Sequence, residues 1–510
     1  MSNTKGMALT LGDGPLGLDA LRAWERHRGP VRLAAAARER MAASVATVRR
    51  VIESGEASYG INTGFGAFAN ARISTSQLSQ LQYNLVRSHA CGVGEPLPPA
   101  LVRRIMLLKA NSLAVGVSGI RAEVVDALLA LLQADVLPII PGRGSVGASG
   151  DLAPLAHLAL ALIGEGEALR GTTRLDGPAV LDAAGCAPVR LEAKEGLALL
   201  NGTQLSTALA IEGLFRAETL LGTAITAGAL SVEGLAGSYT PFDDRIQAAR
   251  GLAPQREVAA RFRELLTDSE IHSSHVDCDR VQDPYAVRCM PQVFGAIAAT
   301  LGHARDVLEA EANGVSDNPL VFDDDILSGG NFHAAPVGFV ADFMAVAVAE
   351  LGSMSERRID LLARRVNPNL KMFLTDEPGV ESGFMIAHVT AAALASENKT
   401  LAHPASVDTI PTSAGQEDHV SMAPWAGHKL LAACDNTAIV LAIELLAAAH
   451  AVDEQRPLAT TPPLAALHAR IRAQAPFVRG DRRLDRDIAA LASMVREGAL
   501  EAPGAIARHR

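Results

Sequence analysis

Apolar residues recur along most of the chain at intervals of three and four, the spacing that places them on one face of a helix. The pattern predicts helices over 18–52, 76–89, 97–113, 122–136, 152–163, 205–233, 290–311, 336–363, 383–400 and 426–450. At a rise of about 1.5 Å per residue, the stretch 336–363 would span about 40 Å. Several helices of that length with alanine-rich faces are typical of a bundle in which backbones approach closely.

Composition supports the same fold class. Apolar residues make up 49% of the 510 residues and aromatic residues only 4%, and much of the apolar content is alanine and leucine, which favour helix over strand. We therefore expect a mainly α fold with a long central helical bundle and a smaller N-terminal lobe. The length suggests two or three domains. The expected division is 1–200 for the N-terminal lobe, 201–455 for the bundle and 456–510 for a charged helical end piece.

The formal net charge of −10 argues against a nucleic-acid partner or an anionic membrane. The five cysteines are odd in number and scattered, without a C-x-x-C pair, which indicates reduced thiols in a cytoplasmic protein. The first 25 residues lack the apolar core of a signal peptide. The most apolar late stretch, 429–450, contains Asp435 and Glu444, so we expect a buried helix and not a membrane span.

One short loop carries unusual chemistry. Gly144 to Asp151 reads GSVGASGD and lies between a proline-rich segment and the apolar stretch 152–163. Glycine has no Cβ, so its nitrogen can approach a nearby carbonyl closely. Attack of the Gly150 nitrogen on the Ala148 carbonyl would close a five-membered ring. Loss of one water from that ring and one from the Ser149 side chain would leave an electrophilic methylene on an imidazolone.

The same loop has two simpler interpretations. Gly-Ala-Ser-Gly is often a flexible turn that leads into a helix. Glycines before a helix can also hold a phosphate, but no Gly-Lys-Ser or Gly-Lys-Thr follows here.

Other polar residues stand in glycine-rich or helix-terminal positions. Gln282, Tyr285 and Arg288 are three residues apart, so a helical turn would bring them to one face, where the guanidinium could hold a carboxylate through two hydrogen bonds. His272, His275 and Cys278 share this spacing, but it is not a usual zinc frame and a fourth ligand is missing. We expect no metal.

The run from Arg143 to His157, RGSVGASGDLAPLAH, resembles the signature of the aromatic amino acid ammonia-lyase and aminomutase family. The likeness extends from about Tyr59 to about residue 450. It includes YGINTGFG at 59–66, Asn-Gly-Thr at 201–203, QDPYAVR at 282–288 and GGNFH at 329–333. The resemblance implies that Ala148, Ser149 and Gly150 cyclise by themselves to a methylidene-imidazolone, so that no dissociable cofactor is needed.

The resemblance also implies roles for single residues. Tyr59 and Tyr285 would be acid and base, in an order that the sequence leaves open, and Asn201 would stand beside the ring. Substrate-binding roles would fall to His89, Gln282, Arg288, Phe332 and Glu417. Members of the family are homotetramers whose active sites draw on three subunits, which would explain why these segments are far apart in sequence.

The stretch Ser413 to Met422 resembles the histidine-handling branch of the family through Gln416-Glu417-Asp418. The Glu417 carboxylate could accept an imidazole N–H, and leaving it unpaired in a buried site is costly. With His89 it would form a polar pocket end that phenylalanine could not satisfy. We therefore expect elimination of ammonia from L-histidine to give trans-urocanate, the first step of histidine degradation.

Three alternatives stay open. A tyrosine or phenylalanine ammonia-lyase, or a 2,3-aminomutase, would use the same ring, and His89 is compatible with tyrosine. A catalytically inactive helical scaffold would lack the ring or leave the tyrosines idle. A fumarase-like lyase is also a long helical tetramer, but its Gly-Ser-Ser catalytic loop is not found here.

Overall fold

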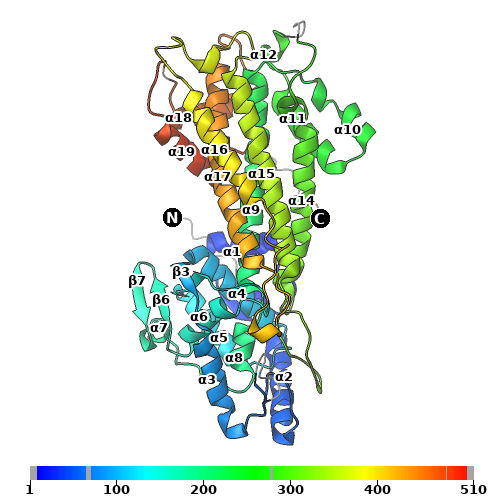
Figure 1. Ribbon diagram of the computed structural model, residues 1–510, viewed down its shortest axis with the longest axis vertical. Coiled ribbons are helices and arrows are strands. Elements are labelled where there is room, and N and C mark those ends of the chain that lie inside the picture. Colours follow the sequence, from blue (N-terminus) through cyan, green and yellow to red (C-terminus); the bar gives the residue numbers. More distant parts are fainter. Residues whose placement is uncertain (1–7, 65–70, 276–279, 478, 502–510) are drawn as a thin grey trace. The chain divides into compact units, whose positions relative to one another are not determined.

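The computed structural model describes residues 8–64, 71–275, 280–477 and 479–501, and it is mainly helical (Figure 1). The chain forms two compact units. The first comprises Met1–Glu212, Arg305–Val340 and Ala405–Gly427, and the second comprises Gly213–Ala304, Ala341–Pro404 and His428–Arg510. The expected division at residues 200 and 455 followed chain order. Each unit is instead built from three separate stretches of the chain, which passes from one unit to the other inside four long helices and once between Pro404 and Ala405.

The first unit holds most of the short elements. Its helices are α1 (Leu18–His27), α2 (Ala35–Ser54), α3 (Leu78–His89), α4 (Pro99–Ala114), α5 (Ala122–Gln133), α6 (Leu152–Leu162), α7 (Pro178–Asp182) and α8 (Glu195–Leu200). Helices α4, α5, α6 and α8 form its apolar interior, and every residue of α8 is buried. The predicted helices 76–89, 97–113, 122–136 and 152–163 are confirmed to within three residues.

Small sheets connect these helices. Strands β1 (Leu9–Leu11) and β2 (Val31–Leu33) pair in parallel, and β3 (Val93–Pro96) pairs antiparallel with β5 (Pro141–Arg143). Strand β4 (Val136–Pro138) joins the hairpin of β6 (Glu167–Arg170) and β7 (Thr173–Asp176), and β8 (Leu320–Phe322) pairs with β9 (Asp325–Leu327). Strands β5 and β4 thus lie directly before the Gly144–Asp151 loop and fix where it begins.

The predicted single helix over 18–52 is wrong in its middle. Helix α1 ends at His27 because Arg28 adopts a left-handed conformation with φ of 49°. Gly29 and Pro30 follow, and proline cannot continue a helix without losing a backbone hydrogen bond. The chain makes β2 there and starts again as α2 at Ala35.

The second unit is a bundle of long helices. It contains most of α9 (Gln204–Gly234), α14 (Met290–Asn313), α15 (Ala335–Ala363) and α17 (Ala423–Asp453), together with α16 (Met385–Leu401). Small residues let these helices approach: a Cβ on Gly213 would lie 2.1 Å from the Leu430 side chain, and one on Gly234 would lie 2.7 Å from that of Ala451. The remaining helices are α10 (Asp244–Arg250), α11 (Ala253–Leu266), α12 (Glu270–Ser273), α13 (Tyr285–Arg288), α18 (Pro462–Gln474) and α19 (Asp485–Arg496).

A fully buried ion pair lies in the core of this bundle. The Arg358 guanidinium on α15 contacts the Glu444 carboxylate on α17 at 2.5 and 2.8 Å, and neither side chain is exposed. Ser231 of α9 and Ser355 of α15 also donate to this carboxylate, at 2.7 and 2.6 Å. Both carboxylate oxygens therefore have partners, which is the condition under which a buried charge is tolerated.

Helices α15 and α17 are long and apolar enough to cross a membrane by length and composition. In their most apolar windows, however, 67% and 72% of the residues are buried inside the structure. They are core helices, as predicted for 429–450.

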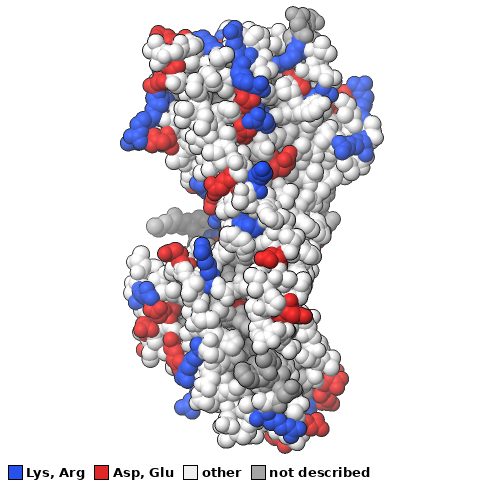
Figure 2. All heavy atoms as spheres, viewed as in Figure 1, with Lys and Arg blue, Asp and Glu red and all other residues white. Residues whose placement is uncertain are grey.

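On the face drawn in Figure 2, basic and acidic side chains are interspersed.

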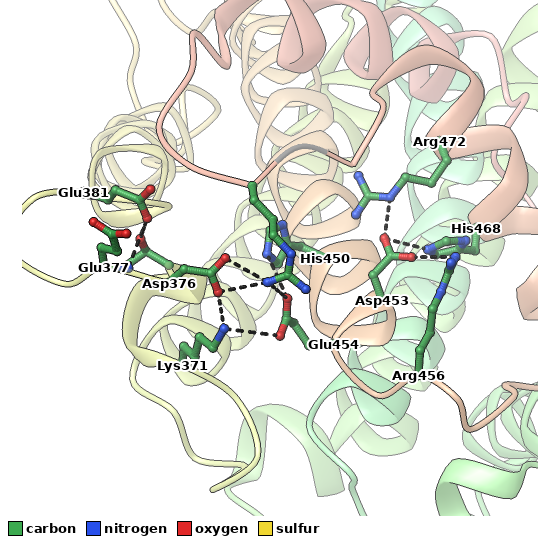
Figure 3. A network of polar contacts seen from close by, with 12 residues as sticks. Lys371, Asp376, Glu377, Glu381, His450, Asp453, Glu454, Arg456, His468 and Arg472 are labelled. Carbon is green, nitrogen blue, oxygen red and sulfur yellow. Dashed lines mark hydrogen bonds and ion pairs between the residues drawn. The ribbon is translucent and has the colours of Figure 1, made fainter.

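A polar network holds the last helices of the second unit to the rest of it (Figure 3). Asp453 accepts from Arg472 of α18 at 2.7 Å and lies 3.2 Å from the His468 ring nitrogen, while Arg479 contacts Asp376 at 2.8 Å. The His450 ring contacts the rings of Phe384 and Phe477. Burial lowers the pKa of His450 to about 4, and the nearby Arg472 charge acts in the same direction.

Candidate active site

The first unit contains a cavity of about 1140 Å³. It is lined from separate parts of that unit, including the loop after α2, the end of α3, the Gly144–Asp151 loop, the end of α8, the loop after β9 and the loop before α17. The predicted site residues that line it are Tyr59, His89, Ala148, Ser149, Asn201, Phe332 and Glu417. Seven residues spread over 359 positions of sequence thus meet at one cavity.

Close backbone contacts fix the Gly144–Asp151 loop. Gly150 has a φ of 70°, and a Cβ there would lie 2.3 Å from the Gly202 carbonyl oxygen. Gly147 has a φ of 64°, and its Cβ would meet the Ser421 hydroxyl at 2.2 Å. Only glycine fits these two positions, because both the backbone angle and the space exclude a side chain.

The Asp151 carboxylate holds the loop in place through hydrogen bonds. Its carboxylate accepts from the Ser145 hydroxyl at 2.8 Å and from the backbone N–H and hydroxyl of Ser206 at 2.8 and 2.9 Å. Burial raises the pKa of the Asp151 carboxyl, although the hydrogen bonds from Ser206 and Ser145 oppose this. The motif thus continues one residue beyond the three that could form a ring.

A second loop packs against the first. The Asn201 side-chain amide donates to the Ser149 carbonyl at 2.7 Å, and the Asp151 N–H donates to the Gly202 carbonyl at 2.7 Å. The Asn201 Oδ1 is buried and has no hydrogen-bond partner among the residues that the structure describes. This side chain therefore polarises the Ser149 carbonyl and leaves one acceptor beside the cavity.

The Glu417 carboxylate lies directly against Ser149. The Ser149 hydroxyl donates to Oε1 at 2.7 Å, and the Thr412 hydroxyl donates to Oε2 at 2.6 Å. Backbone hydrogen bonds between Thr412 and Glu417 fix the loop. Most of the stretch 413–419 lines the cavity, and only Glu417 is half-buried there while its neighbours remain exposed.

His89 is the last residue of α3 and is half-buried at the same cavity. Burial lowers the pKa of its imidazole, although the Leu85 carbonyl and the Glu417 charge oppose this. Tyr59 and Phe332 are also half-buried. Phe65 and Gly66 of the Tyr59 loop lie outside the described residues.

Gln282, Tyr285 and Arg288 belong to the second unit. The predicted helical turn is wrong in one respect: α13 begins only at Tyr285, so Gln282 precedes it. The side chains nevertheless gather, because Arg288 donates to the Gln282 amide oxygen and its guanidinium lies 5.7 Å from the centre of the Tyr285 ring. Tyr285 is 75% exposed, so this cluster presents a phenol and a guanidinium to the surface of its unit.

The three residues considered as metal ligands do not form a site in the described part of the chain. His272 stacks on Tyr239 with ring centres 3.6 Å apart, and the His275 Nδ1 lies 3.0 Å from the Ile271 carbonyl. Cys278 lies outside the described residues.

Sequence reasoning missed three residues of the site. Asp151 ends the Gly144–Asp151 loop and Thr412 directly precedes the Ser413–Met422 stretch, but neither residue was assigned a role from the sequence. Lys109 lies in the middle of the apolar helix α4, and its ammonium donates to the Asn201 carbonyl at 2.6 Å. A single lysine in a helix that is otherwise buried was the signal that could have identified it.

The residues present fit a ring made from the chain. Gly150 has no side chain that would block the approach of its nitrogen, the Ser149 carbonyl already accepts a hydrogen bond, and the Ser149 hydroxyl lies against a carboxylate. Residues 148–150 supply every atom of the ring, so no separate binding site is needed.

Comparison with known proteins shows which sequences and folds this chain resembles. The profile of the family described as aromatic amino acid lyase matches residues 16–473. Histidine ammonia-lyase of Burkholderia cenocepacia is 55% identical over 496 residues, which cover 96% of this chain and 97% of that protein. The crystal structure of histidine ammonia-lyase from Trypanosoma cruzi superposes with a TM-score of 0.89 at 40% identity, covering 97% and 94% of the two chains. Tyrosine aminomutase from Streptomyces globisporus superposes with a TM-score of 0.92 at 33% identity, covering 98% and 100%.

Proposed function

The chain belongs to the aromatic amino acid lyase family, and we propose that the cavity of its first unit is where it handles its substrate. The activity is that of a histidine ammonia-lyase, a carbon–nitrogen lyase of histidine catabolism, because near-full-length relatives at 53–55% identity carry that activity in their names. The finer proposals concern the ring, the roles of the residues and the assembly.

The first proposal is that Ala148, Ser149 and Gly150 become a methylidene-imidazolone, an electrophile that makes the substrate amine a better leaving group. One observation links this ring to histidine as the substrate. The Ser149 hydroxyl occupies Oε1 of Glu417 in the linear chain, and ring formation removes that hydroxyl as water. The oxygen would then be free to accept an N–H from the imidazole of L-histidine.

His89 supports the same orientation of the substrate. Burial lowers the pKa of His89, which keeps its ring neutral at pH 7. The ring can therefore hydrogen-bond the substrate imidazole without bringing a positive charge to it. A phenylalanine ring offers no N–H to Glu417, and the half-buried carboxylate would lose a partner on binding it. Phe332 would pack against the substrate ring from another side of the cavity.

We assign the substrate carboxylate to Arg288 and Gln282, because a guanidinium binds a carboxylate through two parallel hydrogen bonds. Their place in the second unit, on an exposed cluster, suits donation to the cavity of a neighbouring copy. The cavity also exceeds the roughly 300–1,000 Å³ of ordinary small-molecule sites. Parts of another subunit would fill the remainder.

A homotetramer is therefore the proposed assembly. The long helices carry apolar side chains that remain exposed in the single chain: Phe339, Phe343 and Val346 on α15 are 48%, 48% and 50% exposed, and Ile386 and Val389 on α16 are 62% and 54% exposed. Positions three and four apart share one helix face. Burying these faces in contacts between copies would remove them from water.

Tyr59 and Tyr285 are the proposed acid and base. Removal of the β-proton needs a group within hydrogen-bond reach of it, and both phenols come from loops or short helices next to the residues that would hold the substrate. Tyr285→Phe is expected to lower kcat by about 10²–10⁴-fold with the ring intact. Initial rates with L-histidine measure this, and a near-normal rate would remove Tyr285 from the mechanism.

A cytoplasmic location accompanies these proposals. Four cysteines in the described residues, Cys91, Cys186, Cys289 and Cys434, are free thiols, which suits a reducing compartment.

Two measurements test the proposed function. Ultraviolet absorbance is followed while the purified protein is incubated separately with L-histidine, L-tyrosine and L-phenylalanine, and urocanate from histidine alone is expected. A product from tyrosine or phenylalanine instead would keep the ring and discard the role of Glu417. The intact mass should lie below that of the linear chain by two waters, and a full linear mass would discard the ring.

A further inference from the structure

Lys109 is buried in a position that packing alone does not explain. It lies in the third turn of α4, is 1% exposed, and is surrounded along its helix by buried residues. Its Nζ donates to the Asn201 carbonyl at 2.6 Å. Burying an ammonium costs free energy unless charges or hydrogen bonds compensate, so a leucine or methionine would suit a purely structural role better.

Other charges act on this ammonium from the elements around it. Asp317 and Asp151 attract it, whereas Lys194, which is paired with Asp317 at 2.7 Å, repels it. Burial lowers the pKa of Lys109 to about 7, and the two aspartates oppose the decrease. The group thus stands at the border between its charged and neutral forms.

The contact continues to the ring-forming loop. Asn201 follows the last turn of α8 with φ and ψ of −79° and 126°, so the helix does not fix the direction of its carbonyl. Lys109 holds that carbonyl, and the amide of the same residue donates to the Ser149 carbonyl at 2.7 Å. The Ser149 carbonyl is the one that would remain in the ring, conjugated to the methylene.

We propose that Lys109 is a positioning residue, which acts through Asn201 to keep an amide N–H aimed at the Ser149 carbonyl during ring formation and turnover. This inference rests on the ring proposed above. An N–H fixed at that oxygen stabilises negative charge there when a nucleophile adds to the conjugated methylene, and donors held in advance contribute most because they need no reorganisation.

The first test compares three variants. Lys109→Met removes the donor at similar length, Lys109→Arg keeps a cation with N–H donors, and Asn111→Leu is the matched control. Asn111 lies two residues further on α4, is also buried, and donates to the Ala312 carbonyl at 2.9 Å, away from the ring-forming loop. Each variant is assayed for intact mass, thermal unfolding, kcat and KM with L-histidine.

Lys109→Met should reduce the fraction of chains that have lost two waters and lower kcat by about 10–100-fold, the range seen when a group supporting a catalytic residue is lost. KM should stay within about threefold, because the residue does not touch substrate. Lys109→Arg should recover part of kcat, and Asn111→Leu should keep full ring content and kcat within about twofold despite its own loss of stability. A kcat and ring content for Lys109→Met within twofold of the unmodified protein would overturn the proposal.

A double-mutant cycle with Asn201→Ala separates positioning from general stabilisation. If Lys109 acts through Asn201, adding Lys109→Met to Asn201→Ala changes ring content and kcat by less than about twofold. Independent, multiplying effects would refute the route through Asn201. If Lys109→Met yields no folded protein, the cycle is run with Lys109→Gln, whose shorter side chain does not reach the Asn201 carbonyl as the Nζ does, and the same two criteria apply. A linear mass for the unmodified protein would refute the ring itself, which is a different result from normal maturation of the Lys109 variants.

Discussion

Two carboxylates of this chain, Glu444 in the second unit and Glu417 in the first, show how differently a partly or fully buried charge can be used. Glu444 is completely buried, and both of its carboxylate oxygens accept hydrogen bonds from Arg358, Ser231 and Ser355. The proposed chemistry removes none of these donors. Glu417 is half-buried, has no guanidinium contact among the residues that the structure describes, and one of its two hydroxyl partners belongs to Ser149. The permanent partners of Glu444 stabilise the fold. Loss of the Ser149 hydroxyl would instead leave one oxygen of Glu417 available to a ligand.

The comparison is tested most strongly at Ser149. Ser149→Ala removes the hydroxyl that ring formation would expel, so no methylene can form. We expect kcat with L-histidine to fall by roughly 10³-fold or more, while the unfolding temperature stays within a few degrees. Urocanate absorbance and intact mass measure the two consequences. Substantial activity with the linear mass retained would contradict the use of Ser149.

Arg358→Met should have the opposite profile. It leaves the Glu444 carboxylate buried without its cation, and breaking such a pair costs about 3–5 kcal/mol of unfolding free energy. Denaturant unfolding measures the loss, and kcat per folded molecule should stay within about twofold. The double variant Arg358→Met with Glu444→Leu should regain much of the stability. Lost turnover at unchanged stability would show that the bundle pair is part of the site after all.

Glu417→Gln sharpens the comparison at the first unit. The amide keeps the shape and can still contact Ser149 and Thr412, but it is a weaker acceptor for an imidazole N–H. The kcat/KM for L-histidine should fall by about 10–100-fold. Initial rates of urocanate formation measure it. An unchanged kcat/KM would assign the recognition of imidazole to other residues.

The smallest expected effect concerns His450, in the network of Figure 3. Its pKa of about 4 in the folded chain lies below the roughly 6.5 of an unfolded histidine. Between those values the unfolded chain binds more protons, so stability falls as pH drops from about 6.5 towards 4, by about 1–2 kcal/mol at pH 5. His450→Gln should flatten this slope in unfolding experiments at a series of pH values without changing kcat. An unchanged slope would place the titration elsewhere.

Much of the fold could be predicted from spacing alone. Helices α9, α14, α15 and α17 agree with the apolar pattern to within three residues at each end, because a long helix repeats the same signal many times. The break between α1 and α2 was missed although Gly29-Pro30 marks it. The gathering of Gln282, Tyr285 and Arg288 was predicted for the wrong reason, since a side-chain hydrogen bond and not a helical turn joins Gln282 to Arg288.

By itself, the sequence determined the mainly helical class and singled out seven of the residues that line the cavity. The helical class follows from local apolar spacing, whereas the seven residues were identified by resemblance to a known family. Only the tertiary structure decided that each unit is built from three separate stretches of the chain, that Glu417 lies 2.7 Å from the Ser149 hydroxyl, and that Lys109 reaches the Asn201 carbonyl. Those contacts join residues 92 to 268 positions apart, and their geometry depends on packing between elements, which no local pattern encodes.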